Sequence, residues 1–274
     1  MLSYQHIYHA GCFADIVKHV FLSRIIDYMT QKDKPMLYLE THAGRGLYDL
    51  ESHIAKKTGE AQDGIFKLWP HHQNLVPGFT PLINILQQVN HFKKLRFYPG
   101  SAQIALYQCR QQDRMVFCEL HPQEIRALES LSNQGKKVSI EQTDGIEKIK
   151  ALVPPPEKRA LIFIDPSYEV KEEYHSIPKA IALNYKKFPQ GVYVLWYPML
   201  HSLAHQTLIK NFKKISAEKT LHLQFWMENS KNNRMYGTGL YIINPPYVLA
   251  EEAQSIFKNL QTIFKDQKSG YLIE

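Results

Sequence analysis

The residues best suited to chemistry end an apolar run in the stretch ALIFIDPSYE, where Asp165, Pro166, Ser167 and Tyr168 follow one another. A carboxylate beside a backbone carbonyl can accept both protons of a planar amino group. The nitrogen lone pair then faces an electrophile, and transfer depends on positioning and electrostatics. Asp165 is suited to take the released proton and Tyr168 to stack on a flat ring. The pattern favours group transfer to an amino nitrogen, whereas the simpler interpretation of Asp165 is a turn acid or helix N-cap.

A second copy of this pattern occurs in GLYIINPPYV, where Asn244 precedes two prolines and Tyr247. Chain order separates the two copies. Asp165 ends the fourth predicted strand, on the edge where the preceding strands also end. Asn244 ends a strand that follows a hairpin, so it is expected to be antiparallel and to leave the sheet at the opposite end. We therefore interpret residues 244–247 as a strand stop, with Tyr247 packing or reaching toward solvent.

Three earlier strand ends carry residues that suit a nucleoside ligand. Gly44 and Gly46 form a GxG turn after the first strand, where backbone N–H groups can approach a ligand closely. Glu119 ends the second strand and suits two ribose hydroxyls. Asp144 precedes Gly145 at the end of the third strand, where it is either an N-cap or a contact to an adenine amino group. Together these ends indicate S-adenosylmethionine, while the incomplete GxGxxG fingerprint disfavours a nicotinamide cofactor.

The elements that must position these residues alternate along the chain. Seven apolar runs predict strands, at residues 35–40, 114–120, 136–142, 159–165, 191–198, 220–227 and 237–244. Helical patterns cover residues 13–29, 123–134, 145–153, 176–188 and 203–215. The alternation predicts an α/β fold with a seven-stranded, mostly parallel sheet and helices on both faces. Residues of about 50–97 replace a single crossover helix, which predicts an inserted helical subdomain within one domain of residues 1–274.

Composition limits which binding partners and which cellular compartment are expected. The chain of 274 residues has a net charge of +7, which favours polyanions such as nucleic acid. Three scattered cysteines indicate reduced thiols, and the start lacks a signal-peptide pattern, so a cytoplasmic protein is expected. No apolar run is long enough to span a bilayer. The thirteen histidines form no metal-ligand spacing, so no metal is expected.

Several blocks in order along the chain resemble one family. They are MLSYQHIYHAGCFADIVKH (1–19), KPMLYLETHAGRGLY (34–48), YPGS (98–101), ELHP (119–122), the DG pair (144–145), LIFIDPSYE (161–169) and LWYP (195–198). In these blocks the chain is similar to the bacterial 23S ribosomal RNA adenine-N6 methyltransferases of the RlmJ type. The resemblance implies a Rossmann-like class I methyltransferase with an inserted helical subdomain. It also implies an adenine in 23S ribosomal RNA as substrate, naked or in early assembly particles, and a monomer is expected.

The resemblance also implies roles for individual residues. Asp165 would be the catalytic acceptor. The cofactor S-adenosylmethionine would be bordered by His19, His42, Ser101, Glu119, Asp144, Gly145 and Asp165. The target nucleotide would be faced by Tyr4, His6, Lys18, Pro166 and Tyr168. Ser167 departs from the family's usual second proline, which concerns the rigidity of the loop rather than its chemistry.

Each carried-over residue has a simpler interpretation. His19 can be a hydrogen-bonded core histidine, His42 a turn cap and Lys18 a solvated surface residue, while Tyr4 can serve packing alone. Ser101 can be the N-cap of the helix that follows it.

Other functions fit the same residues. A DNA adenine or protein glutamine methyltransferase has the same chemical problem at its amino nitrogen, so the motif does not separate these substrates. A non-catalytic RNA-binding module with a vestigial cofactor fold is another class, which the intact Asp165 and Glu119 disfavour.

Overall fold

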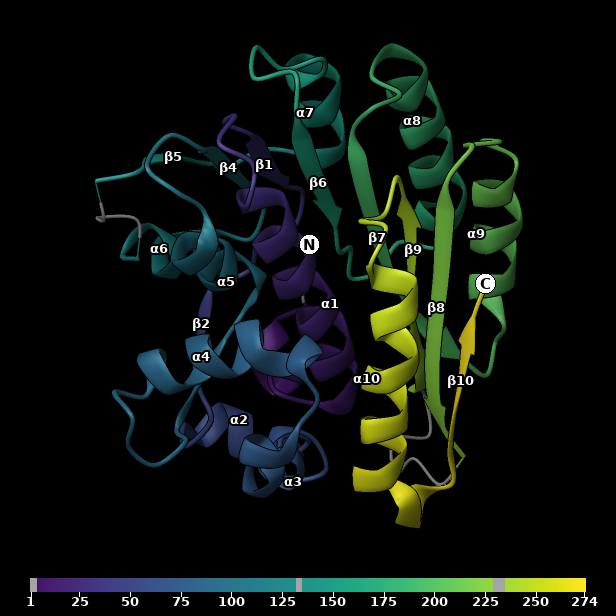
Figure 1. Cartoon of the computed structure of the whole chain (residues 1–274). Coiled ribbons are helices and arrows are strands. Elements are labelled where there is room, and N and C mark those ends of the chain that lie inside the picture. Colours follow the sequence, from purple (N-terminus) through teal and green to yellow (C-terminus); the bar gives the residue numbers. More distant parts are fainter. Residues whose placement is uncertain (1–3, 132–134, 229–234) are drawn as a thin grey trace.

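The computed structural model describes residues 4–131, 135–228 and 235–274. Within these residues one sheet has eight strands in the order β10-β8-β9-β7-β6-β1-β4-β5, and β2 pairs with β3 separately (Figure 1). The strands are β1 (Leu37–Glu40), β2 (Leu47–Asp49), β3 (Phe97–Pro99), β4 (Arg114–Cys118), β5 (Lys137–Glu141), β6 (Ala160–Ile164), β7 (Val192–Leu200), β8 (Thr220–Met227), β9 (Met235–Ile243) and β10 (Ser269–Ile273). The α-helices are α1 (Phe13–Thr30), α2 (His53–Thr58), α3 (Ile65–Leu68), α4 (Thr80–Val89), α5 (Ser101–Gln108), α6 (Pro122–Glu129), α7 (Gly145–Leu152), α8 (Glu173–Lys187), α9 (Ala204–Lys213) and α10 (Leu249–Ile263). The 3-10 helices are η1 (His6–Tyr8), η2 (Trp69–Asn74), η3 (Pro77–Phe79) and η4 (Lys265–Gln267).

The register of the parallel strands brings their carboxyl ends to one edge. β1 pairs in parallel with β4 and β6, so that Glu40 lies opposite both Phe117 and Phe163. β5 and β7 extend the parallel part on either side. Because all these strands run the same way, the loops that follow them emerge together, as open α/β sheets require of a ligand site.

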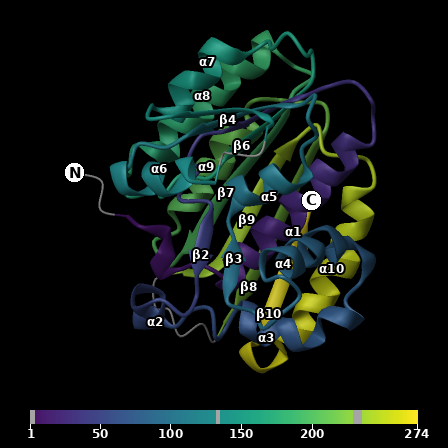
Figure 2. The same cartoon turned by 90° about the vertical axis from the view of Figure 1, so that its left-hand side faces the viewer.

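Two layers of helices enclose the sheet. One face of the sheet forms a buried cluster with side chains of α1, α5 and α10. The other face forms a second buried cluster with side chains of α7, α8 and α9. Figure 2 shows these layers on either side of the strands. Both faces of the central strands are therefore apolar, which explains their nearly continuous hydrophobic sequences.

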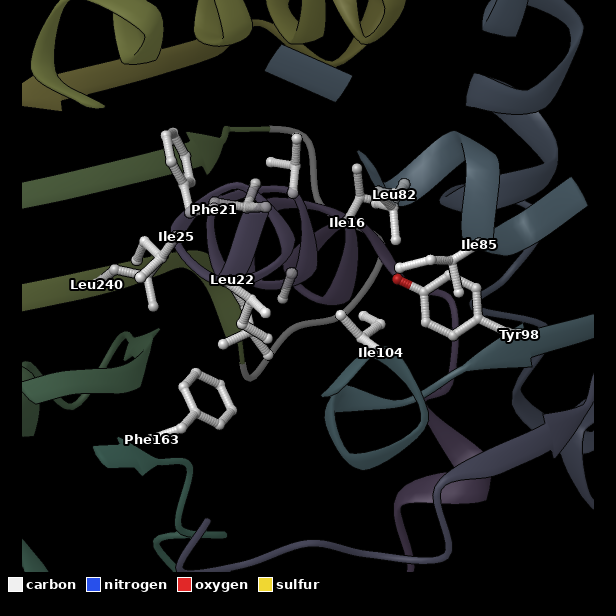
Figure 3. Close-up of a cluster of buried hydrophobic side chains, with 14 of the residues drawn as sticks. Ile16, Phe21, Leu22, Ile25, Leu82, Ile85, Tyr98, Ile104, Phe163 and Leu240 are labelled. Atoms are coloured by element: carbon white, nitrogen blue, oxygen red, sulfur yellow. The ribbon is translucent and has the colours of Figure 1, made fainter. Parts of the chain in front are cut away.

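Helix α1 is the centre of the larger cluster. Figure 3 shows its side chains Ile16, Phe21, Leu22 and Ile25 between α4, α5 and the sheet. These four residues are fully buried. Polar α1 residues on the side that faces the sheet edge are buried as well, so α1 is covered on nearly all sides rather than on one stripe.

Short helices fill the chain between β2 and β3. Helices α2, α3, η2, η3 and α4 lie there, and the antiparallel pairing of Leu47 with Pro99 brings the two ends of this segment together. The segment occupies the lower part of both whole-chain views (Figures 1 and 2). Its description as an inserted subdomain of about 50–97 stays a prediction.

The strand count predicted from the sequence is wrong by one. All seven predicted strands are present, but β10 adds an eighth, antiparallel to β8 at the sheet edge. Its sequence, SGYLI, is short and contains a glycine, and its residues are half-buried, so it has little strand signal of its own. Helix α10 has no counterpart among the predicted elements either. The predicted helix at 123–134 ends at Glu129, and its last residues, 132–134, lie outside the described residues.

The second copy of the motif lies at the opposite end of the sheet. β9 is antiparallel to β7, and its last residue, Ile243, pairs with Tyr193 near the start of β7. Asn244 follows in the left-handed region (φ 55°), which asparagine tolerates, and its amide donates hydrogen bonds to the carbonyls of Pro189 and Gly191, both at 2.7 Å. The interpretation of this copy as a strand stop agrees with this geometry. Tyr247 does not pack into the core, because it is 82% exposed.

No helix in the described part of the chain is long and apolar enough to cross a membrane.

The buried position of α1 leads to a stability prediction. Leu22→Ala is expected to lower the free energy of unfolding by about 2–5 kcal/mol, because it leaves a cavity beside the sheet. Leu183→Ala on α8 is the matched control: Leu183 is 50% exposed, and the expected change is within about 0.5 kcal/mol. Urea unfolding of both variants measures the difference, and equal losses would contradict the central role of α1.

Candidate active site

The strand ends meet the N-terminal segment at a cleft of about 820 Å³. Its walls come from the start of the chain, from α1, from the loops after β1, β4 and β6, and from residues 58–63 of the segment between β2 and β3. Ten of the predicted site residues line it: Tyr4, His6, Lys18, His19, His42, Ser101, Glu119, Asp165, Pro166 and Tyr168. Predicted site residues that are far apart in the sequence, such as Tyr4 and Tyr168, therefore line the same cleft.

Asp144 and Gly145 are not among the residues that line the cleft. Asp144 is the N-cap of α7, and its carboxylate accepts a hydrogen bond from the Ile146 N–H at 2.8 Å. A Cβ on Gly145 would lie 2.2 Å from the Thr41 carbonyl oxygen, which is too close for any side chain. This pair therefore packs the start of α7 against the loop after β1, next to His42.

Lys18 connects α1 to the end of β6. Its Nζ lies 2.7 Å from Asp165 Oδ2 and 3.0 Å from Asp15 Oδ1, and only 3% of its side chain is exposed. Burial alone would lower the pKa of Lys18, but the Asp15 and Asp165 carboxylates outweigh burial and raise it above its ordinary value. Lys18 is thus a buried, charged partner of Asp165 and not the solvated surface residue of the simpler interpretation.

Asp15 was not predicted from the sequence, yet it organises the N-terminal segment. Its Oδ2 accepts from the Gly11 N–H at 2.9 Å and contacts His6 Nε2 at 2.8 Å. Burial raises its pKa, but His6 and Lys18 outweigh that effect and place the pKa well below its usual range. The signal available in the sequence was an acid three residues before Lys18 on one helix face.

The N-terminal tyrosine continues this chain of contacts. Tyr4 Oη lies 2.8 Å from His6 Nδ1, and the Tyr4 ring stacks on the His9 ring with centroids 5.7 Å apart. The Tyr4 backbone N–H donates to Glu169 Oε2 at 3.3 Å, beside the loop that follows β6. Tyr4 therefore faces the cleft through polar contacts rather than serving packing alone.

The loop after β6 is held by its tyrosine. Tyr168 has left-handed backbone (φ 56°) and is 7% exposed. Its hydroxyl donates to the Trp196 carbonyl at 2.7 Å, and its ring lies 4.6 Å from the Tyr174 ring. Ser167 Oγ accepts from the Glu169 N–H at 3.4 Å. The left-handed residue turns the chain so that Asp165 and Tyr168 both border the cleft.

Glu119 holds the glycine turn after β1. Its Oε2 accepts from the Gly44 N–H at 2.8 Å and its Oε1 from the His121 N–H at 2.7 Å. Gly44 has φ 58°, a conformation that suits glycine. Burial raises the pKa of Glu119, although both backbone N–H groups oppose the shift. A carboxylate has about four acceptor positions, so each oxygen can still accept from a ligand hydroxyl.

His19 has one nitrogen left over for a ligand. Its Nδ1 lies 2.9 Å from the Tyr98 hydroxyl, while its Nε2 is buried and has no hydrogen-bond partner among the described residues. Burial lowers the pKa of His19 well below its usual value, so the ring is neutral near pH 7. A neutral, unpartnered ring nitrogen on the cleft wall fits a polar group of a bound cofactor.

His42 is also neutral near pH 7, because burial lowers its pKa to about 4. Its Nδ1 lies 2.8 Å from Thr41 Oγ1.

Ser101 is not the N-cap of α5. Gly100 occupies the cap position, and Ser101 Oγ donates instead to Glu40 at the end of β1. The Tyr38 hydroxyl donates to the other Glu40 oxygen at 3.0 Å. Burial raises the pKa of Glu40 to about 8. Glu40 was not singled out from the sequence, because the glycine turn was taken as the ligand-binding feature of the first strand end.

In residues 4–131, 135–228 and 235–274, no group of three or more His, Cys, Asp or Glu side chains is placed to hold a metal ion.

Comparisons with known proteins agree on one family. Residues 33–274 match the family described as ribosomal RNA large subunit methyltransferase D, RlmJ. The chain is 38% identical to ribosomal RNA large subunit methyltransferase J of Escherichia coli (strain K12), over 99% of this chain and 97% of that protein. It is 34% identical to the protein of the same name from Haemophilus influenzae, over 100% of this chain and 98% of that protein. A crystal structure of a Legionella pneumophila protein has a TM-score of 0.92 and 44% identity, covering 97% of this chain and 98% of that one.

The raised pKa of Glu40 leads to a prediction about stability and pH. An acid with a raised folded-state pKa contributes stability below its ordinary pKa of 4.5, and this contribution is lost as the pH rises through about 8. Glu40→Gln keeps this position neutral, so wild type should lose stability relative to the variant between about pH 5 and about pH 9. Urea unfolding across that range measures the difference.

Glu157 provides the control, because its hydrogen bond from Arg114 lowers the pKa of its carboxyl group. Glu157 is therefore ionised in the folded and the unfolded chain across this range, and Glu157→Gln should show no such pH-dependent difference from wild type. Parallel stability curves for wild type and Glu40→Gln would refute the raised pKa.

Proposed function

Because this chain belongs to the RlmJ family of ribosomal RNA large subunit methyltransferases, we propose that it transfers a methyl group from S-adenosylmethionine to the N6 amino group of an adenine in 23S ribosomal RNA. The bound cofactor would supply an activated methyl group and leave as S-adenosylhomocysteine. The residues of the chain then have to hold the adenine amino group and accept its proton.

The observation that carries the site assignment is the pairing of Asp165 with Lys18. Lys18 Nζ engages Asp165 Oδ2 at 2.7 Å, and Asp165 Oδ1 has no hydrogen bond within the described residues. A carboxylate held on one oxygen by a buried cation keeps a fixed orientation and presents its second oxygen to the cleft. This geometry supports Asp165 as the acceptor for the target amino group.

Two acceptors at this edge explain the chemistry. The adenine amino nitrogen is a weak nucleophile, because its lone pair is delocalised into the ring. Asp165 and the Pro166 carbonyl together would accept both N–H protons and direct the lone pair at the methyl group, as in-line displacement requires. Asp165 would then take the proton that the nitrogen loses. The remaining barrier falls through orientation and electrostatic stabilisation rather than through a covalent intermediate.

The target base needs an aromatic residue to stack on and residues that hold its nucleotide. Tyr168 borders the cleft with its hydroxyl fixed, so its ring has a defined orientation for stacking on an extruded adenine. Lys18 lies 5.1 Å from the centre of the Trp196 ring, which adds a second aromatic wall. Tyr4 and His6 would contact the target nucleotide from the N-terminal side, where they line the same cleft.

The cofactor would lie along the other strand ends. Glu119 would accept from ribose hydroxyls, and the unpartnered His19 Nε2 and the neutral His42 offer polar contacts to the remainder. Ser101 and Asp165 complete this side of the proposed cofactor site. Asp144 and Gly145 would act beside it, by fixing the loop that holds His42.

We propose protein-free 23S ribosomal RNA or an early assembly particle as the form of the substrate, and a cytoplasmic monomer as the form of the enzyme. The net charge of +7 supports association with RNA phosphates.

Asp165→Asn tests the proposed chemistry. The amide keeps the shape of the side chain but cannot take the proton, so the methylation rate should fall about 10²- to 10⁴-fold. Affinity for S-adenosylmethionine, measured by calorimetry, should stay within a few-fold. Methylation is measured on protein-free 23S ribosomal RNA, duplex DNA and protein side by side, with mass mapping of N6-methyladenine.

Asn244→Asp is the matched control, since it places an aspartate at the position in the second copy that corresponds to Asp165. A carboxylate cannot donate the two hydrogen bonds that the Asn244 amide makes. The substitution should therefore lower the free energy of unfolding by about 1–3 kcal/mol. The methylation rate of the folded variant should remain that of wild type. An unchanged rate in Asp165→Asn, or methylation of DNA in preference to RNA, would refute the assignment.

A further inference from the structure

The loop after α4 presents an aromatic side chain to solvent. Phe92 is 76% exposed, and neither it nor the following lysine lines the cleft. In Figure 1 the chain that follows α4 runs at the left-hand edge of the molecule. A single exposed apolar residue needs no explanation by itself. The backbone and the charges around Phe92 make this one different.

The backbone at this position is unusual for an aromatic residue. His91 and Phe92 have φ values of 50° and 55°, two consecutive residues in the left-handed region. Bulky side chains rarely adopt this conformation, and a loop that only had to turn would use glycine or asparagine. Backbone strain of this kind is concentrated at functional positions.

Asn90 makes the strained loop rigid. Its side-chain amide donates to the carbonyls of Leu86 at 2.8 Å and Phe97 at 2.9 Å. Its carbonyl oxygen accepts from the N–H groups of Arg96 and Phe97, both at 2.8 Å. Asn90 itself is 5% exposed. One buried side chain thus closes the loop with four hydrogen bonds, and Phe92 is held outward on a fixed base.

Cationic residues follow the exposed Phe92 along the loop. Lys93 and Lys94 follow it, and Arg96 ends the loop. Arg96 pairs with Asp49 at 2.7 Å and Lys94 with Glu51 at 3.1 Å, while no ion pair involves Lys93 in the described part of the chain. These contacts leave an exposed aromatic next to an uncompensated positive charge.

The neighbouring helix adds to this charge. Lys56 and Lys57 are exposed in the last turn of α2. Glu51, which pairs with Lys94, directly precedes Ser52, the N-cap of α2, so this ion pair joins the loop to the start of that helix. The next residues, Thr58 and Gly59, line the cleft. The lysines of α2 thus lie between the loop and the residues that line the cleft.

We propose that Phe92, Lys93, Lys94 and Lys56 form an RNA-docking surface outside the catalytic cleft, where Phe92 stacks on an unpaired base and the lysines contact the adjoining phosphates. The inference rests on the proposed RNA substrate and adds a second contact region to it. Aromatic rings flanked by cations suit unpaired nucleotides, because every base has a flat face and every linkage a negative charge. The surface therefore selects RNA that is longer than the target nucleotide and its immediate neighbours.

Substitutions at Phe92 test the stacking contact. Binding of protein-free 23S ribosomal RNA fragments is measured by anisotropy, with fragments shortened stepwise around the mapped methylation site. Phe92→Ala should weaken binding of the long fragments about 5- to 100-fold and raise their KM, with kcat unchanged. The shortest substrate should bind the variant and wild type equally. Phe92→Leu should resemble Phe92→Ala, and Phe92→Tyr should resemble wild type, because stacking needs the ring.

Lys93→Gln tests the phosphate contact. The slope of log affinity against log salt should fall by about 0.7 to 0.9, the value for one neutralised phosphate. Affinity for S-adenosylmethionine should not change in any of these variants.

Tyr247→Ala is the matched control. Tyr247 is also an exposed aromatic residue (82%), but it follows β9 at the end of the sheet opposite the cleft. It should bind every fragment as wild type does. Wild-type RNA affinity in Phe92→Ala would overturn the proposal, even if this surface then proved to bind a protein. Absence of RNA methylation by wild type would instead overturn the proposed function, and binding of full-length 23S ribosomal RNA by wild type and Phe92→Ala would still decide the docking surface.

Discussion

The rest of this site depends on one buried cation. Lys18 is 3% exposed and pairs with Asp15 on its own helix and with Asp165 at the end of β6. Removing one partner from such a group leaves an uncompensated charge in a low-dielectric interior, which is strongly destabilising. Helix α1, the N-terminal segment that Asp15 holds through His6, and the loop after β6 are therefore fixed relative to one another by electrostatics as well as by packing.

Different kinds of interaction fix the residues on the two sides of the cleft. On the proposed substrate side, ion pairs and aromatic rings set positions, because Tyr168 is tied to the carbonyl of the same Trp196 whose ring lies near Lys18. On the proposed cofactor side, backbone groups set positions. Glu119 is oriented by N–H groups, and Gly145 lets α7 approach the loop after β1. An arrangement of this kind can hold a charged acceptor on one side and a nucleoside on the other without rearranging either.

Most of the fold followed from local patterns. Continuous apolar runs predicted the seven strands, and the alternation with helices predicted their direction, because parallel strands need crossovers. Asp165 was distinguished from Asn244 by strand order and by the predicted hairpin before the last strand, and the antiparallel pairing of β9 with β7 agrees with this distinction. The edge strand β10 was missed because five half-buried residues with a glycine carry no clear period, and their pairing with β8 is decided by the neighbouring strand.

The sequence by itself determined which residue types end each parallel strand, since chain direction places those ends at one edge. Only the tertiary structure decided which buried polar groups meet. Ser101 binds Glu40 and His19 binds Tyr98, across 61 and 79 residues of chain. Such contacts produce no periodic pattern in the sequence, because the two partners are distant along the chain and meet only when their elements pack together. The same holds for Asp15, whose role appears only once α1 lies beside the end of β6.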